Sequence, residues 1–279
     1  MVTTMALGAA LASPVAVAQE VGANTVIPVP VPRTETIHWV DRPGRERVEL
    51  DANGVKLRGW RYKVLSEPSH SETPVVVFFN GNMMTVERSE ELYRQLAELG
   101  MEVVVYDYRG YGFSQGRPDV MAFRRDALRI YDHTVEENPG RRVMVYGFSL
   151  GTAMAAYVAS ERRVAAVVLA APFATAEREM PVFARRMGFS SEAIRRMAPA
   201  EDARVAFDEV GMMRRSEAPL LVLSGTEDTL VPMEQGREVL AASAAKEKRF
   251  VELRGAQHYE TVFVEKALVA VRTFLSVLG

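Results

Sequence analysis

The sequence predicts an α/β protein with a mostly parallel, doubly wound sheet, an antiparallel hairpin at its start and a small helical lid. Three observations support this prediction. From about residue 45 onward, short apolar runs rich in β-branched residues alternate with amphipathic helical stretches. Most runs are apolar throughout, as expected of strands that helices cover on both faces. The first two instead alternate between apolar and polar residues on either side of Asn53-Gly54, a dipeptide typical of tight hairpin turns.

The predicted elements follow one another in a regular order. The hairpin covers residues 47–64, and helical stretches separate most of the strands that follow it. Because a strand–helix–strand unit returns the chain in the same direction, we expect these later strands to pair in parallel. The strands are expected at 74–80, 101–108, 142–148, 165–173, 219–225 and 248–253. The helices are expected at 86–99, 120–137, 150–161, 233–245 and 259–277.

Residues 173–217 interrupt this alternation, because they contain helical stretches with no strand between them. An insertion at this place between two core strands predicts a small lid. Its paired arginines are typical of a solvated helix face. Its methionines and phenylalanines suit either the core of the lid or a deformable pocket for an acyl chain, and the sequence leaves both interpretations open. These residues are Met180, Phe183, Met187, Phe189, Met197, Phe207, Met212 and Met213.

The overall composition excludes several classes of protein. The chain has 279 residues, of which 48% are hydrophobic and 25% charged, as is usual for a globular domain. A net charge of −2 gives no basic footprint for nucleic acid. The absence of cysteine excludes disulfides, thiolate metal ligands and a cysteine nucleophile. No apolar stretch is long enough to predict a transmembrane segment.

The N-terminal residues predict export. Residues 1–18 resemble a signal peptide, because an apolar run ends in Ala16-Val17-Ala18, a cleavage-like pattern, with Gln19 next. The basic residues that usually precede such a run are absent, so an apolar tail is the alternative. A periplasmic or secreted protein is expected in the first case and a cytoplasmic one in the second. Residues 19–44 read as a proline-rich linker, and residues 45–279 as the folded domain.

The candidate nucleophile is Ser149, in the stretch GFSLG at residues 147–151. It stands between a predicted strand and a predicted helix. A serine on such a sharp turn projects its hydroxyl above the sheet, where only glycine fits two residues to either side. Gly147 and Gly151 occupy these positions. Since ligands of a doubly wound sheet bind beyond the carboxyl ends of its strands, Ser149 lies where a substrate is expected.

A serine hydroxyl is a weak nucleophile, so it needs a base and an acid that orients the base. On this architecture the chain order is serine, acid, histidine. Of the four histidines only His258 follows Ser149, and it lies in a loop after the last predicted strand. Asp228, after the strand at 219–225, is the preferred acid, with Glu227 as the alternative.

An oxyanion also needs preorganised donors. The backbone N–H of Leu150, directly after the nucleophile, is expected to be one of them. The second is expected in the loop after the first core strand, FFNGNMM, from the backbone of Asn82, with Met83 as the alternative.

Taken together, NGN, YDYRGYGFSQG, GFSLG, GTEDTLVP and GAQH make the chain resemble the α/β-hydrolase superfamily. Within it, the chain is similar to the short-lidded serine hydrolases that include the α/β-hydrolase-domain protein depalmitoylases. The resemblance covers residues 45–279 and implies the α/β-hydrolase fold. One departure is Asn80, where these relatives usually carry histidine. Since oxyanion donors are backbone groups, this change is expected to alter loop packing more than chemistry.

Cofactor chemistry is not expected. The glycines at 110, 112 and 116 miss the spacing of a dinucleotide-binding motif by one residue, and the scattered histidines form no metal-ligand pattern. The residues predict a serine hydrolase that cleaves carboxylic esters or thioesters through an acyl-enzyme, with a small-molecule or acylated substrate. The alternative is a binding protein of this fold without significant turnover. The sequence does not specify the oligomeric state.

Overall fold

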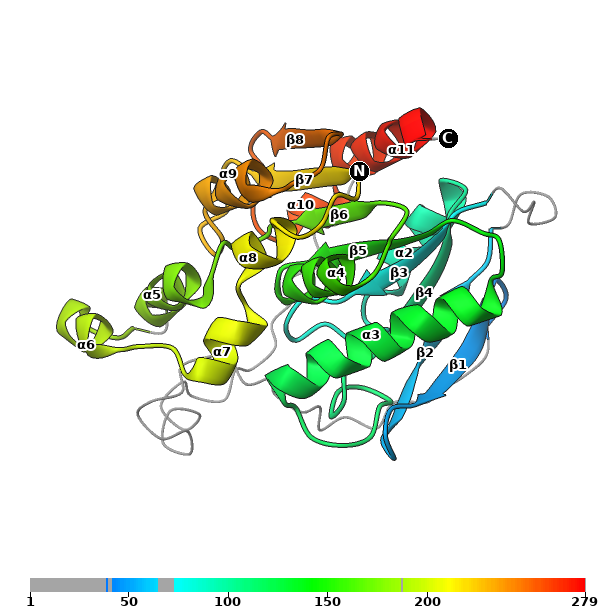
Figure 1. Cartoon of the computed structure of the whole chain (residues 1–279), viewed down its shortest axis with the longest axis horizontal. Coiled ribbons are helices and arrows are strands. Elements are labelled where there is room, and N and C mark those ends of the chain that lie inside the picture. The colour runs from blue at the N-terminus through cyan, green and yellow to red at the C-terminus, as the bar shows by residue number, and fades with distance from the viewer. Residues whose placement is uncertain (1–38, 40–41, 65–72, 187, 279) are drawn as a thin grey trace, which may run out of the picture.

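The computed structural model describes residue 39 and residues 42–64, 73–186 and 188–278. The predicted signal peptide, most of the predicted linker and Met187 lie outside these residues. One eight-stranded sheet forms the centre, in the order β1-β2-β4-β3-β5-β6-β7-β8, with helices on both faces (Figure 1). The predicted fold class is therefore confirmed.

The sheet is antiparallel only at its start. β1 (Arg45–Asp51) and β2 (Lys56–Tyr62) form the hairpin, and β2 pairs antiparallel with β4 (Glu102–Tyr106). Asn53 and Gly54 both have positive φ, as a tight primed turn requires. All further pairs are parallel. Each strand of this part pairs with its neighbour in the order β4-β3-β5-β6-β7-β8. The further strands are β3 (Val75–Phe79), β5 (Val143–Phe148), β6 (Val167–Ala170), β7 (Leu220–Gly225) and β8 (Lys248–Leu253).

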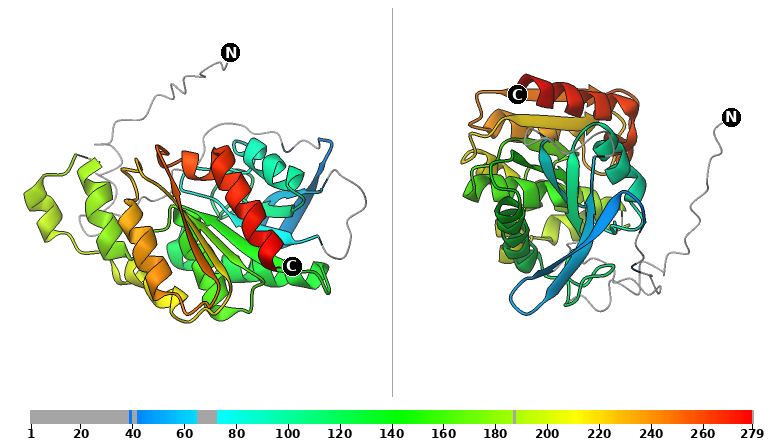
Figure 2. Two further views of the ribbon diagram at one scale, coloured as in Figure 1. Left: turned by 90° about the horizontal axis from the view of Figure 1, so that it is seen from above. Right: turned by 90° about the vertical axis from the view of Figure 1, so that its right-hand side faces the viewer.

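Helices cover both faces of the central strands, in which every residue from β3 to β7 is buried. One face carries α3 (Val120–Glu137), α4 (Leu150–Glu161) and α9 (Met233–Ala242); the other carries α2 (Glu90–Glu98) and α11 (Glu265–Leu278) (Figure 2). The single helix expected over 259–277 is divided, because the extended backbone of Val264 ends α10 (Glu260–Phe263) before α11 begins.

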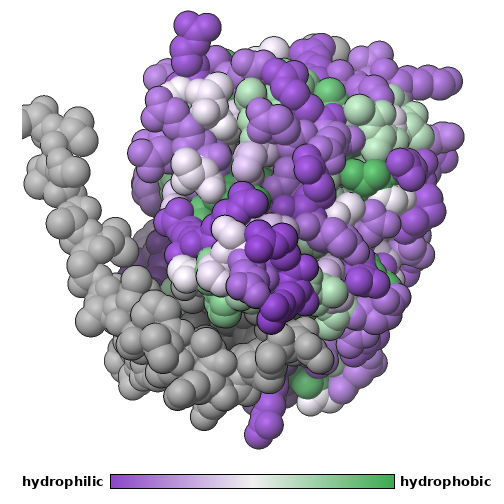
Figure 3. Space-filling model, turned by 90° about the vertical axis from the view of Figure 1, so that its left-hand side faces the viewer, coloured by the Kyte–Doolittle hydropathy of each residue, from purple (hydrophilic) through white to green (hydrophobic). Residues whose placement is uncertain are grey.

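Four short helices lie between β6 and β7, where the sequence predicts a lid. They are α5 (Ala176–Arg186), α6 (Ser191–Arg196), α7 (Glu201–Ala206) and α8 (Glu209–Met213). α5 and α6 project from the body, whereas α7 and α8 return against α3 and α4 (Figure 1). The surface at this end of the molecule is largely hydrophilic, with scattered apolar side chains (Figure 3).

The apolar residues of this insertion divide into two groups. Phe207, Met212 and Met213 belong to the main hydrophobic core, and Phe207 packs edge-to-face on Phe173 at 5.6 Å between ring centroids. Met180 is buried outside that main core, in the projecting part. The C-terminal end of the insertion is thus part of the domain core, whereas Met180 on α5 is buried apart from it.

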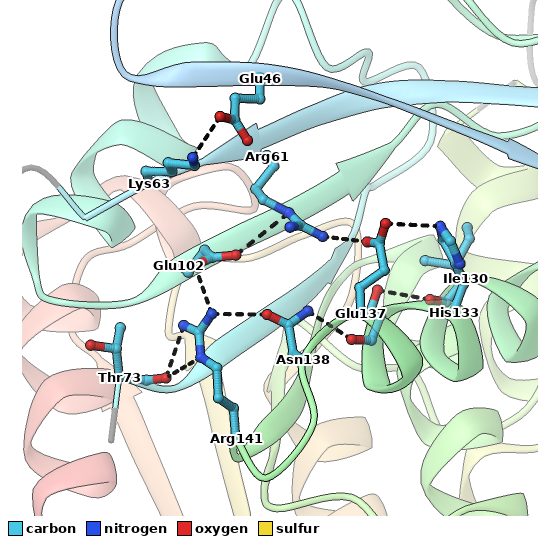
Figure 4. Close-up of polar contacts among 11 residues, drawn as sticks. Glu46, Arg61, Lys63, Thr73, Glu102, Ile130, His133, Glu137, Asn138 and Arg141 are labelled. Carbon is cyan, nitrogen blue, oxygen red and sulfur yellow. Dashed lines mark hydrogen bonds and ion pairs between the residues drawn. The ribbon is translucent and has the colours of Figure 1, made fainter. Parts of the chain in front are cut away.

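A polar network fastens the amino ends of the central strands, opposite the carboxyl ends where ligands bind (Figure 4). Glu102, at the start of β4, lies 3.5 Å from Arg61 Nε and 2.9 Å from Arg141 Nη1. Arg141 also donates to Asn138 Oδ1 at 2.8 Å and to the Thr73 carbonyl at 3.0 Å. These contacts join β2, β3, β4 and the chain that enters β5, so they support the scaffold.

Candidate active site

Ser149 stands at the junction of β5 and α4 with φ of 51° and ψ of −119°. This left-handed backbone is costly for a residue with a side chain, so the surrounding structure must hold it in place. A Cβ on Gly147 would lie 2.3 Å from the Gly151 carbonyl oxygen, and one on Gly151 would lie 2.0 Å from that of Phe79. Both glycines are therefore needed to form the turn.

His258 lies in the loop between β8 and α10, and its ring connects two distant parts of the chain. Its Nε2 is 2.9 Å from Ser149 Oγ, and its Nδ1 is 2.8 Å from Asp228 Oδ2. The ring is nearly buried and packs against Phe148 at 5.0 Å between centroids. The carboxyl ends of β5, β7 and β8 thus bring together the three side chains that the sequence singles out.

Asp228, rather than Glu227, contacts the histidine. The Asp228 side chain is 1% exposed, and its Oδ1 accepts the backbone N–H groups of Leu230 and Val231, each at 2.9 Å. These two bonds occupy one carboxylate oxygen and leave the other for His258. Glu227 is exposed to solvent. The turn that follows β7 therefore holds the Asp228 carboxylate in place through these backbone hydrogen bonds.

The loop after β3 passes beside the serine turn. Gly81 packs so closely that an added Cβ would lie 2.8 Å from the Phe148 ring, and Met83 has φ of 63°. Asn82 Oδ1 accepts a hydrogen bond from the Tyr111 hydroxyl at 3.1 Å. Leu150 is the first residue of α4, where backbone N–H groups have no helical partner. Of the two segments that the sequence predicts as oxyanion donors, the one with Asn82 is thus held by a hydrogen bond to Tyr111.

Asn80 is part of the packing of this loop. Its side-chain oxygen accepts a hydrogen bond from the Tyr93 hydroxyl, and its backbone carbonyl accepts one from Tyr108 at 2.8 Å. The side chain is buried with 1% exposure. Asn80 therefore supports the loop through its hydrogen bonds with two tyrosines.

Two carboxyl groups beside the site, the half-buried Glu179 and the buried Glu209, were not predicted. Glu179 on α5 accepts a hydrogen bond from Gln235 Nε2 at 2.8 Å, and Glu209 on α8 lies 2.6 Å from Thr152 Oγ1. Burial raises the pKa of Glu179 to about 8, and burial raises the pKa of Glu209 well above its usual range. Both stand among charged residues in the sequence, so no local pattern marks them. Only the folding of the insertion onto α4 and α9 shields them from solvent, Glu209 fully and Glu179 in part.

No helix in the described ranges is long and apolar enough to cross a membrane. The same ranges contain no group of three or more His, Asp or Glu side chains that could hold a metal ion.

Comparison with known sequences finds several relatives. A family model for serine aminopeptidase, S33, matches residues 70–210. An uncharacterized protein of Mycobacterium tuberculosis is 30% identical over 237 residues, which are 84% of this chain and 79% of that protein. The lysophosphatidylserine lipase ABHD12 of Danio rerio is 28% identical over 218 residues, 71% of this chain. The match spans only 56% of the length of that lipase.

Solved structures show the same fold at low sequence identity. An esterase of Pyrococcus furiosus superposes with a TM-score of 0.70 and 19% identity, covering 90% of this chain and 99% of the esterase. Est1E of Butyrivibrio proteoclasticus, solved with ferulic acid bound, gives a TM-score of 0.66 and 19% identity, covering 83% and 98% of the two chains.

Proposed function

The chain belongs to the α/β-hydrolase family of serine aminopeptidase, S33, and from this premise we propose that it is a serine hydrolase that cleaves carboxylic esters or thioesters. The observation that carries the proposal is the position of His258, which lies within hydrogen-bond distance of both Ser149 and Asp228. A base between a nucleophile and a buried carboxylate is the arrangement that activates a serine hydroxyl.

In the proposed reaction, Ser149 Oγ attacks the acyl carbon while His258 Nε2 takes its proton. Asp228 accepts the Nδ1–H and stabilises the imidazolium that forms. The oxyanion is bound by the backbone N–H groups of Leu150 and Asn82. Collapse of the tetrahedral intermediate expels the alcohol or thiol, which receives the proton from His258, and leaves an acyl group on Ser149. Water then attacks with His258 as base, which releases the acid and restores the serine.

We propose that an acyl chain binds beside the insertion. Support comes from the apolar side chains of its projecting part, among which Phe183, Phe189 and Met197 are half-buried. The names of the relatives, a lysophosphatidylserine lipase and an esterase, agree with an acyl substrate. The match spans only 56% of the length of that lipase, so the proposal concerns the acyl half of the substrate.

Hydrolysis of a series of p-nitrophenyl esters and acyl thioesters by the purified protein tests the proposal. Each methylene that the insertion buries contributes up to about 0.8 kcal/mol, so kcat/KM should rise about two- to fourfold per CH₂ until the pocket is full. Met197→Ser should flatten the series and spare the shortest ester. The His133→Ala variant, which changes a histidine on α3, serves as control and should match the wild type. Absence of hydrolysis of every ester and thioester by the wild type would overturn the proposal.

A further inference from the structure

Glu209 is the first residue of α8 and lies against the start of α4. Its side chain has 0% exposure, and no Lys, Arg or His side chain of the described residues pairs with it. Thr152 Oγ1 lies 2.6 Å from its Oε1, and the backbone N–H of Phe173 also faces the carboxyl. An ionised carboxylate buried without a cation is very unfavourable, so this environment favours the protonated acid.

The contacts of the Thr152 hydroxyl also indicate that Glu209 is protonated. Its Oγ1 lies 2.5 Å from the Ser149 carbonyl oxygen and 2.6 Å from Glu209 Oε1. A threonine hydroxyl carries one proton, and a carbonyl oxygen can only accept. Thr152 therefore donates to Ser149, and the contact with Glu209 is a hydrogen bond only when Glu209 supplies the proton.

The carbonyl at the end of this chain belongs to the peptide unit that joins Ser149 to Leu150. It accepts a second hydrogen bond, from the Thr152 backbone N–H at 2.8 Å. Because a trans peptide unit is planar, fixing this C=O also fixes the direction of the Leu150 N–H, which points the opposite way. A carbonyl that accepts strong hydrogen bonds also polarises the N–H of the same unit.

We propose that Glu209 is a positioning residue that acts as a neutral acid through Thr152 to orient the Ser149–Leu150 peptide and its oxyanion-binding N–H. The inference rests on the proposed hydrolase function. It also gives the insertion a second role, because α8 belongs to that insertion and its first residue supports the nucleophile turn from below. Loss of the donor should therefore slow acylation and leave binding of the substrate unchanged.

Two matched pairs of variants test this. Glu209→Gln keeps an N–H donor, whereas Glu209→Met fills a similar volume without one; Thr152→Ser keeps the hydroxyl, whereas Thr152→Val removes it. The donor-free variants should lose about tenfold in kcat at unchanged KM, as expected for one hydrogen bond, and the donor-retaining variants should stay within about threefold of the wild type. The Glu209→Met/Thr152→Val double variant should lose no more than Thr152→Val alone, because both changes break one chain.

A trifluoromethyl ketone forms a tetrahedral adduct with an active serine. Its affinity therefore measures oxyanion binding, which a purely structural role of Glu209 would leave unchanged. Its affinity should fall with kcat in the donor-free variants and be retained in Glu209→Gln. Equal loss in the Gln and Met variants, or multiplied losses in the double variant, would overturn the inference. If Glu209→Met does not fold, the Thr152 pair decides, since equal activity of Thr152→Ser and Thr152→Val overturns it as well. Inactivity of the wild type would refute the hydrolase function itself, which separates the two failures.

Discussion

Replacement of Glu179 by glutamine should stabilise the protein at alkaline pH and have little effect at acidic pH. Glu179 accepts a hydrogen bond from Gln235, which in turn accepts the Ala174 N–H at 3.1 Å, and the nearby carboxylate of Asp228 repels its negative charge. Burial, followed by that repulsion, raises its pKa from 4.5 to about 8. Glutamine retains the shape and the acceptor oxygen but cannot ionise.

The sign follows from proton binding in the two states. Between pH 4.5 and about 8 the folded protein holds a proton on Glu179 that the unfolded chain has released, so stability falls as pH rises through this window. At about 1.36 kcal/mol per pKa unit the full shift corresponds to about 5 kcal/mol. Because the side chain is only partly buried, we expect about 2 kcal/mol, or a Tm difference of about 4 to 8 °C.

Thermal unfolding followed by circular dichroism from pH 5 to pH 9 measures this effect. The Tm of Glu179→Gln minus that of the wild type should be near zero at pH 5 and increase to its full value by pH 9. The control is Glu177→Gln on the same helix, which removes an exposed ion pair with Arg204 and should shift Tm by a small, constant amount. A constant difference for Glu179→Gln, or one that shrinks as pH rises, would refute the reasoning.

The other predictions concern the site. Asp228→Asn should lower kcat by about four orders of magnitude, because His258 loses its orienting acceptor, while Glu227→Gln should be mild; steady-state kinetics check this, and the reverse ranking would make Glu227 the acid. Gly151→Ala should lower Tm and kcat together, since its Cβ would lie 2.0 Å from the Phe79 carbonyl next to the oxyanion loop. Gly140→Ala, whose Cβ would meet nothing within 4 Å, should lower the free energy of unfolding by only about 1 kcal/mol, because a residue with a side chain disfavours this positive φ. Similar Tm and kcat values for the two glycine variants would contradict the packing argument.

Most of the fold could be predicted from local patterns in the sequence. Apolar strands that alternate with helices specify a parallel sheet, and Asn53-Gly54 specifies the turn of the hairpin, because each depends on neighbours in the sequence. The candidate histidine could be selected because only His258 follows Ser149 in the chain. The structure brings these side chains together, and their catalytic roles stay predictions.

Features that depend on distant contacts could not be predicted in this way. For the acid, the sequence favours Asp228 and keeps Glu227 open, because the contact that separates the two joins Asp228 to His258, 30 residues further along the chain. Glu179 and Glu209 look like solvated helix residues until the insertion packs on α9 and α4. The break at Val264 was not predicted either, because the sequence around it is continuously helical in character.

Labelling with a fluorophosphonate probe, read by mass spectrometry of the modified peptide, tests the central claim most directly. The account predicts one modification at Ser149 in the wild type and in the control Ser160→Ala, which changes a serine at the C-terminal end of α4, the helix that Ser149 precedes. Ser149→Ala should remain unmodified, and His258→Ala should react at least about a hundredfold more slowly, since the hydroxyl then lacks its base. Equal labelling of the wild type and Ser149→Ala, or an unchanged rate in His258→Ala, would contradict the assignment of Ser149 as an activated nucleophile.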